Sequence, residues 1–261
     1  MGIYMWRERM PQELCFTANT AGSTVQLTQT WSPTAVTLET SSDGDNWNTY
    51  TIWTTITLSN IWDKVYFRNT SETTTWFSTS GSNYYQFVMS WSINGSWDIN
   101  YLLNKNSTDE VTAYWFIYLF MGCASLVTPP SLPATSVQDF GYYAMFNSCS
   151  WLTTVPSLPA TTIGQYCYYG MFVSCSELAT IPELPATSIP TYAYWFMFNN
   201  SPKIKVSETQ TWEYQTPYRI PKTWTWSAGS SALSSMFNHT WWTFKWTPTI
   251  NTTYYTSNTV V

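Results

Sequence analysis

The chain has 261 residues, of which 44% are hydrophobic, 19% aromatic and only 10% charged, and its net charge is −5. This length is enough for one large domain or two smaller ones. The aromatic content excludes a disordered polyelectrolyte, and the lack of clustered Lys and Arg argues against a nucleic-acid groove. No apolar run reaches the roughly 18 residues that a membrane-spanning helix needs. A surface rich in Thr, Ser and Asn is typical of β-rich extracellular and virion modules.

Residues 1–13 form a leader segment of unclear role. Arg7, Glu8 and Arg9 stand among Met and Trp residues, and no apolar core of a signal peptide is present. A lipoprotein cysteine at Cys15 is disfavoured because no small residue directly precedes it. Either an export signal lies upstream, or the protein reaches its location without one of its own.

Residues 14–103 alternate apolar and polar side chains over short runs. Val25 and Leu27 follow this period of two, as do Ile56 and Leu58, and Gly, Asn, Asp and Pro separate the runs. Such alternation predicts half-buried antiparallel strands. Six or more of them within this length predict an N-terminal antiparallel β-sandwich.

The segment 42–47, Ser-Asp-Gly-Asp-Asn-Trp, resembles the Asp-box hairpin of sialidase propellers and other β-modules, with a shortened spacing. In that interpretation Asp43 caps the turn, Gly44 takes the positive φ and Trp47 anchors the hairpin. A calcium loop built on Asp43 and Asp45 is the alternative. It is disfavoured because two carboxylates without a distal Glu make a poor calcium site.

Residues 104–205 contain a repeat with a period of 26 residues, marked by Phe120, Phe146, Phe172 and Phe198. A fixed period in this range predicts units that bury their apolar side chains by stacking on one another. We expect a short strand at residues 152–155 and 178–181, ended by prolines, and a short helix within residues 161–172. The predicted fold class is therefore mixed β and α/β: a β-sandwich, then a short leucine-rich-repeat solenoid.

The cysteines follow the same period, since Cys123, Cys149 and Cys175 are 26 residues apart. An odd total of five gives no pairing logic for disulfides. A zinc site is disfavoured because the chain has one His and no Cys-x-x-Cys pair. We expect buried free thiols.

Residues 206–261 are predicted to form a degenerate repeat and a C-terminal cap. Met236-Phe237-Asn238 revives the repeat motif after a Thr-rich insertion. Terminal repeats are expected to be atypical because one of their faces meets water.

Three repeat motifs, Cys-x-x-Leu, Leu-Pro-Ala-Thr and Met-Phe-x-x-Cys, together resemble the BspA-like leucine-rich-repeat surface proteins of bacteria, some parasites and phages. The segments 14–18 and 63–68 resemble the β-module that often precedes such repeats, and 217–221 and 250–255 resemble their usual ending. The resemblance implies an adhesin at a cell surface, in the extracellular space or on a virion. It brings no catalytic residues.

Catalysis is not expected. His239 is the only histidine, no nucleophile elbow accompanies it, and the carboxylates are scattered along the chain. We therefore predict no enzymatic activity, no cofactor and no metal.

The predicted function is adhesion to a host or cell-surface protein or glycan through the repeats. The candidate contact residues are Thr128, Thr153, Thr154, Thr180, Glu177, Glu183, Tyr143 and Tyr169. Two tyrosine rows follow the period, one beginning at Tyr142 and one at Tyr143, and at least one row is expected to pack inside. The alternative is a structural spacer or decoration domain of a larger bacterial surface or phage virion protein.

Tryptophan stands at many positions where turn chemistry favours glycine, and the chain has 17 Trp but only 10 Gly. Examples are Trp31, Trp53, Trp62, Trp91, Trp97, Trp212, Trp224, Trp226, Trp241, Trp242 and Trp246. One hypothesis is codon assignment: a UGA codon is translated as Trp where the source organism uses it for Gly, or GGA or GGG codons have drifted. The rival hypothesis is a genuine aromatic surface that stacks on carbohydrate.

Overall fold

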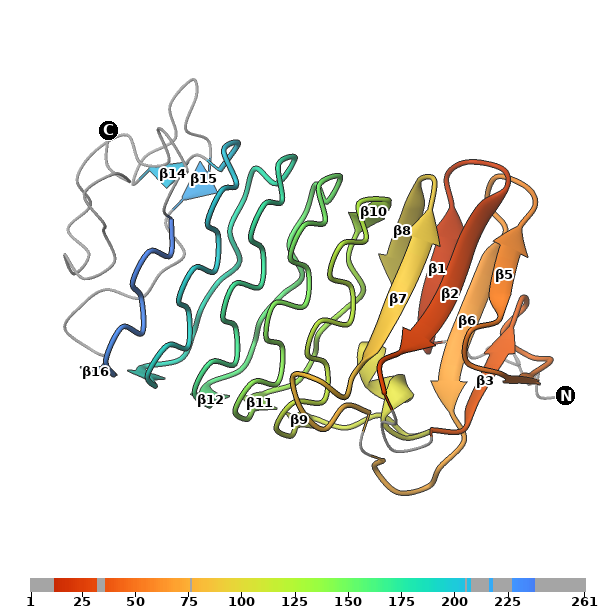
Figure 1. Ribbon diagram of the computed structural model, residues 1–261, viewed down its shortest axis with the longest axis horizontal. Helices are drawn as coiled ribbons and strands as arrows, with labels where there is room; N and C mark the ends of the chain where they lie inside the picture. Colours follow the sequence, from red (N-terminus) through yellow and green to blue (C-terminus); the bar gives the residue numbers. More distant parts are fainter. Residues whose placement is uncertain are drawn as a thin grey trace, which may run out of the picture.

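The computed structural model describes residues 12–31, 36–75, 77–204, 206–207, 216–217 and 227–237. Within these ranges the molecule is elongated and built almost wholly from strands and turns (Figure 1). The only helix among them is the 3-10 segment η1 (Ile99–Leu102). None of the described helical structure has the length and apolar character needed to cross a membrane.

Two sheets face each other at the N-terminal end of the molecule (Figure 1). The larger has six strands, in the order β10 (Leu126–Thr128), β8 (Ile93–Ser96), β1 (Leu14–Ala18), β6 (Lys64–Asn69), β3 (Leu38–Ser41) and β4 (Asn48–Tyr50). The smaller has the order β5 (Thr55–Leu58), β2 (Ser23–Gln29) and β7 (Tyr85–Ser90). All pairs are antiparallel except β10 on β8, which is parallel.

The period-two pattern explains how these sheets pack. Val25 and Leu27 of β2 are fully buried, whereas the residues between them are only half-buried. Phe16 of β1 packs against Phe87 of β7 with ring centroids 4.9 Å apart. Alternating side chains therefore join the two sheets through a shared aromatic core.

After η1 the chain makes successive circuits that stack side by side (Figure 1). We define the circuits by the 26-residue repeat, as residues 110–135, 136–161 and 162–187, followed by a circuit that begins at residue 188. Each begins with a two-residue strand: β9 (Glu110–Val111), β11 (Ser136–Val137), β12 (Thr162–Ile163) and β13 (Ser188–Ile189). β9, β11 and β12 form a parallel sheet, and β13 pairs with β16 (Ser227–Ala228). The remaining pair is β14 (Val206–Ser207) with β15 (Thr216–Pro217).

A run of turns follows each short strand, and its backbone hydrogen bonds alternate in direction. The Tyr143 N–H donates within its circuit to the Phe140 carbonyl at 3.2 Å, whereas the Ala144 N–H donates to Tyr169 of the next circuit at 2.8 Å. Every fourth residue has a positive φ, as at Phe140 (59°), Ala144 (47°) and Ser148 (63°). The alternation satisfies the backbone donors inside and between circuits without forming a helix. We call these runs, residues 114–122, 140–148, 166–174 and 192–200, the turn segments.

The predicted fold class is wrong. The described chain is nearly all β, with sheets of six, three and three strands and two two-stranded pairs, and it contains no α-helix. The helix expected within residues 161–172 is a turn segment, because Tyr166 and Gly170 have positive φ and half of the N–H groups bond to the neighbouring circuit. A leucine-rich-repeat solenoid with one strand and one helix per repeat therefore does not describe this protein.

The strands expected at residues 152–155 and 178–181 are not formed either. The Thr153 N–H donates to Val127 of the preceding circuit at 2.9 Å, but the following Pro156 has no N–H to extend a ladder. In addition, β10 lies in the predicted repeat region yet pairs with β8, so one sheet crosses the predicted boundary between residues 103 and 104. Residues 1–11 of the predicted leader 1–13, and most of the cap predicted for 206–261, lie outside the described residues.

A ladder of buried phenylalanines runs through the circuits. Phe87 of the N-terminal sheets stacks on Phe120 at 5.3 Å, and Phe120, Phe146 and Phe172 continue the stack at 5.3 and 5.6 Å. Phe198 and Phe237 extend it. The N-terminal sheets and the circuits therefore share one hydrophobic core.

The expectation of buried free thiols is confirmed, since all five cysteines are buried and free. The thiols of Cys123, Cys149 and Cys175 each donate to a phenylalanine carbonyl of the preceding layer, at 3.0, 3.1 and 3.2 Å. Ser201 occupies the next position in this row, and its hydroxyl donates to the Phe172 carbonyl at 2.8 Å. The row therefore supplies hydrogen bonds between circuits as well as small buried side chains.

Candidate binding surface

The turn segments place one aromatic ring per circuit at their first left-handed position. These residues are Tyr114, Phe140, Tyr166 and Tyr192, which are 26 residues apart. Successive ring centroids lie 4.7, 4.7 and 4.8 Å apart, and all four side chains are half-buried. The stacking of the circuits thus brings residues that are distant in sequence into a row of rings at the surface.

A second row lies beside the first. Tyr143 and Tyr169 stack with centroids 4.5 Å apart and an angle of 1° between their planes. Tyr118 and Trp195 close the two ends of this pair with edge contacts at 5.5 and 5.4 Å. The rows touch each other, for example where Tyr192 meets Trp195 at 4.6 Å.

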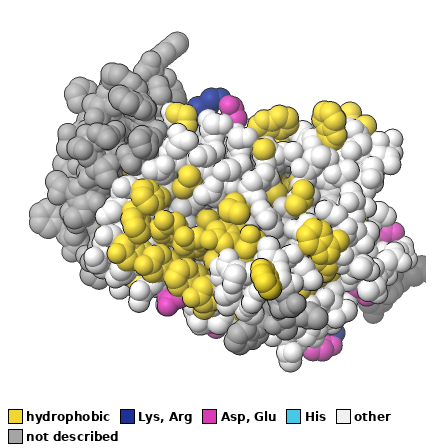
Figure 2. Space-filling model, viewed as in Figure 1, with side chains coloured by type: hydrophobic (Ala, Val, Ile, Leu, Met, Phe, Trp, Pro, Cys, Tyr) yellow, Lys and Arg dark blue, Asp and Glu magenta, His cyan; other side chains and the backbone are white. Residues whose placement is uncertain are grey.

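Together these rings form one surface, which we call the aromatic face. It consists of Tyr84, Tyr114, Tyr118, Phe140, Tyr143, Tyr166, Tyr169, Tyr192, Trp195 and Phe196. Figure 2 shows hydrophobic side chains gathered on the side of the molecule that carries the circuits, with charged side chains mainly near the outline of the view. All ten side chains of the aromatic face are Tyr, Phe or Trp.

Two phenols of this face, those of Tyr143 and Tyr118, have a pKa above the usual value because they are partly buried. Burial, followed by the neighbouring phenols of Tyr118 and Tyr169, raises the pKa of Tyr143 above its usual value. Burial also raises the pKa of Tyr118. The face offers ring edges and hydroxyl groups, and its stacked pairs cover part of one another's ring faces.

The structure brings together only two of the eight predicted contact residues. Tyr143 and Tyr169 are neighbours on the aromatic face. The six others lie on different segments of the circuits, after the cysteine row: Thr128, Thr153, Thr154, Thr180, Glu177 and Glu183.

Several of these six side chains already serve the structure. The Thr128 hydroxyl donates to the Gly95 carbonyl and the Thr153 hydroxyl to the Val127 carbonyl, each at 3.1 Å. Glu177 forms an ion pair with Lys203. Thr154 and Glu183 are exposed, and Thr180 is half-buried.

The sequence interpretation missed the row that begins at Tyr114. The signal was available, because the four members of that row have the same 26-residue spacing as the buried phenylalanines. Of the two tyrosine rows that were considered, the one containing Tyr142, Tyr168 and Tyr194 is buried, and the one containing Tyr143 and Tyr169 is half-buried.

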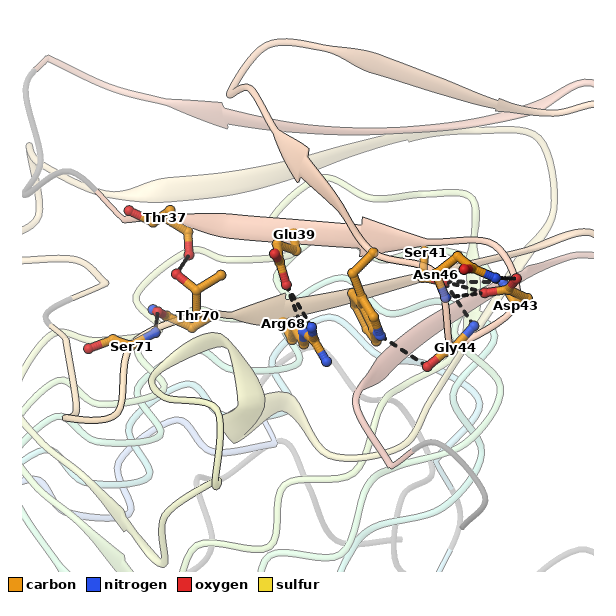
Figure 3. Close-up of polar contacts among 11 residues, drawn as sticks. Thr37, Glu39, Ser41, Asp43, Gly44, Asn46, Arg68, Thr70 and Ser71 are labelled. Carbon is orange, nitrogen blue, oxygen red and sulfur yellow. Dashed lines mark hydrogen bonds and ion pairs between the residues drawn. The ribbon is translucent and has the colours of Figure 1, made fainter. Parts of the chain in front are cut away.

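The turn interpretation of the Asp-box-like segment is confirmed. The Asp43 carboxylate accepts hydrogen bonds from the backbone N–H groups of Asp45 and Asn46 at 2.9 and 2.8 Å, and from the Ser41 hydroxyl at 2.8 Å (Figure 3). The Trp47 indole N–H donates to the Gly44 carbonyl at 3.0 Å. The carboxylate is therefore committed to the turn. In the part of the chain that the structure describes, no group of three His, Cys, Asp or Glu residues is placed to hold a metal.

This hairpin is tied to the neighbouring strand by charge. The Arg68 guanidinium lies 3.9 Å from the centre of the Trp47 ring and donates to the Glu39 carboxylate through two nitrogens, at 2.9 and 2.8 Å (Figure 3). Both nitrogens donate to the same oxygen, Glu39 Oε2, and the guanidinium also covers an aromatic ring, so two kinds of interaction hold the hairpin against the neighbouring strand.

Asp43→Ala is expected to lower the midpoint of thermal unfolding at pH 7. The hydrogen bonds from Asn46, and then that from the Asp45 N–H, hold the pKa of Asp43 well below its usual value. A lowered pKa in the folded state means that the stabilisation is present above the unfolded value of about 3.9 and is lost as pH falls through the folded value. Thermal unfolding of both proteins between pH 7 and pH 2 measures the difference, which should narrow as pH falls.

Asp45→Ala is the matched control, since the Asp45 carboxylate accepts none of the bonds described above. It should leave the midpoint nearly unchanged. Equal losses in the two variants would contradict the capping role of Asp43.

His239 and the tryptophans at 212, 224, 226, 241, 242 and 246 lie outside the described residues. Comparisons of the chain with protein-family models, with curated proteins and with solved structures found no match.

Proposed function

We propose that this chain is a non-enzymatic binding protein that attaches to a protein partner through the aromatic face. The observation that carries the proposal is the contiguous set of ten half-buried aromatic side chains, nine of them on the circuits and the tenth, Tyr84, in contact with Tyr118. Aromatic residues are enriched and charges depleted at the centres of protein–protein interfaces.

The way the rings pack favours a protein over a glycan. A sugar ring stacks on an open aromatic face, but in Tyr143 and Tyr169 the planes lie 1° apart and cover one another. Ring edges and hydroxyls remain, and these suit the apolar side chains and carbonyl groups of a protein surface. A glycan partner is therefore the second choice.

The resemblance of the repeat motifs to BspA-like surface proteins supports the same proposal. It suggests that the partner is displayed by a host or neighbouring cell, and that the chain acts at a bacterial or phage surface. The low content of charged residues in the chain, 10%, is compatible with such a location.

A structural spacer is the second candidate function. It is favoured by the phenylalanine ladder, which runs without interruption from Phe87 in the N-terminal sheets to Phe237. A rod with one continuous core would hold a neighbouring domain at a fixed distance.

An array of cell-surface proteins and glycans, probed with the purified chain, tests the proposal. We expect binding to a protein, and a loss of at least about tenfold in affinity when Tyr143 and Tyr169 are both replaced by serine. Thr154→Ala is the control, because Thr154 is exposed but lies outside the aromatic face.

Binding that the double variant keeps, or binding to glycans alone, would contradict a protein-binding aromatic face. A folded chain that binds nothing would favour the spacer. Circular dichroism of the double variant separates loss of binding from loss of folding.

A further inference from the structure

We propose that residues 31, 53, 62, 91 and 97, which are tryptophan in this sequence, are glycine in the protein that its own organism makes. The proposal does not depend on the proposed function, since none of the five belongs to the aromatic face.

The left-handed backbone positions of the N-terminal part carry this inference. Between residues 12 and 109, within the described ranges, eight residues have a positive φ. Two are glycine, Gly22 (81°) and Gly44 (87°), and five are Trp31 (55°), Trp53 (75°), Trp62 (74°), Trp91 (59°) and Trp97 (63°). The eighth is Ser107 (62°), which lies between η1 and the first circuit. Glycine reaches this region freely, whereas a bulky side chain does so only under strain.

Three turns of the same construction make the comparison direct. In residues 20–23, 51–54 and 60–63 the fourth N–H donates to the first carbonyl, at 3.3, 3.0 and 3.3 Å. In each, the third residue has a positive φ, and its N–H donates to a neighbouring strand at 2.8 to 2.9 Å. The third residue is Gly22 in the first turn but Trp53 and Trp62 in the others. In a type II turn this third residue has a positive φ, and glycine is therefore the preferred residue there.

Nothing in the packing accounts for the five indoles. Their side chains are between 41% and 87% exposed, so burial does not offset the backbone strain. In contrast, Trp115 is buried, Trp47 packs under Arg68, and Trp195 stacks on Tyr192. None of these three has a positive φ.

The circuits show that left-handed positions do not select tryptophan in general. Their described left-handed residues include Tyr, Phe, Ala, Ser, Asn and Gly, and none of these is Trp. Among the described residues, every left-handed Trp therefore lies before the circuits. This distribution is explained if UGA, translated as glycine in the source organism, encodes the left-handed tryptophans and UGG encodes the others, including Trp151, which is exposed but has no positive φ.

Sequencing the gene and peptide mass spectrometry of the protein from its own organism test the proposal together. We expect UGA codons and glycine masses at positions 31, 53, 62, 91 and 97, and UGG codons with tryptophan masses at 47, 115 and 195. Tryptophan masses at the five positions would overturn it, and so would UGG codons there.

Recombinant variants give a second, independent measurement. Trp53→Gly and Trp62→Gly are each expected to raise the midpoint of thermal unfolding by roughly 2–4 °C, through relief of the left-handed strain. Gly22→Trp is the matched reverse change, since a Cβ at Gly22 meets open space and only the backbone strain is added. It should lower the midpoint by a similar amount, and Trp47→Gly should lower it as well. A fall in the midpoint on Trp53→Gly and Trp62→Gly would contradict the inference.

Discussion

Phe146→Ala is expected to lower the free energy of unfolding by about 3–5 kcal/mol. Phe146 is fully buried and stacks between Phe120 and Phe172, with centroids 5.3 and 5.6 Å away. Removing its ring leaves a cavity in the middle of the ladder, and neighbours held by hydrogen bonds between circuits close it only in part. Urea unfolding followed by fluorescence measures the loss.

Phe140→Ala is the matched control for this prediction. Phe140 belongs to the same circuit and also stacks between two rings, but it is only half-buried on the aromatic face. Phe140→Ala should lower the free energy of unfolding by less than half as much as Phe146→Ala. Equal costs would mean that the phenylalanine ladder is not the main source of cohesion between circuits.

The protein is expected to lose stability steeply as pH rises from about 9 to 12. Burial raises the pKa of Cys123 and Cys175 to about 12, and it raises the pKa values of Cys149 and Cys167 well above the usual value. An unfolded thiol ionises near pH 8.5, so between these values the unfolded chain gives up protons that the folded chain keeps. Each such thiol lowers the free energy of unfolding by about 1.4 kcal/mol per pH unit. Below about pH 8.5 the thiols are mostly protonated in both the folded and the unfolded chain, so the thiol contribution to the free energy of unfolding is fully present.

Denaturant unfolding at pH 8, 9.5 and 11 measures this dependence, and Cys175→Ser provides the control. Ser201 shows that a hydroxyl fits this row and makes the same bond to the preceding circuit. The variant should therefore fold normally and show a shallower fall with pH. An unchanged slope would contradict the assignment of alkaline sensitivity to the buried thiols.

The sequence predicted what depends on local pattern and period. Alternation identified Val25 and Leu27 as inward residues, and the turn chemistry around Asp43 was correct in detail. The 26-residue spacing of Phe120, Phe146 and Phe172 reappears as stacked rings, and the cysteine spacing reappears as a row of buried thiols. These features follow from side-chain chemistry at short range or from exact repetition.

The conformation inside each circuit could not be obtained in the same way. Close spacing of Tyr168, Tyr169 and Phe172 is compatible with a helix, and the left-handed φ at Tyr166 is not visible in its residue type. The deciding interactions are hydrogen bonds such as that from the Phe172 N–H to the Met197 carbonyl, 25 residues away. A single sequence does not reveal which backbone donors bond to the next circuit.

The structure does not bring most of the predicted contact residues together, for the same reason. The threonines were chosen because a strand was expected after each ladder cysteine, and an exposed strand would have presented Thr153 and Thr180 to a partner. Without that strand, Thr153 bonds to the neighbouring circuit instead. Of the ten residues of the aromatic face, the sequence analysis selected only Tyr143 and Tyr169. The 26-residue period predicts which residues form a row, but it does not predict whether that row is exposed.

If the aromatic face binds a protein, as we propose, the bound partner covers its rings. Hydroxyl-radical footprinting of the chain, free and bound to the partner selected on the array, measures this protection. Tyr143, Tyr169 and Tyr192 should be oxidised in the free chain and protected in the complex, whereas the exposed Ile61 should be oxidised equally in both. Protection confined to other surfaces, such as that around Thr154, with the three tyrosines unchanged, would contradict the account.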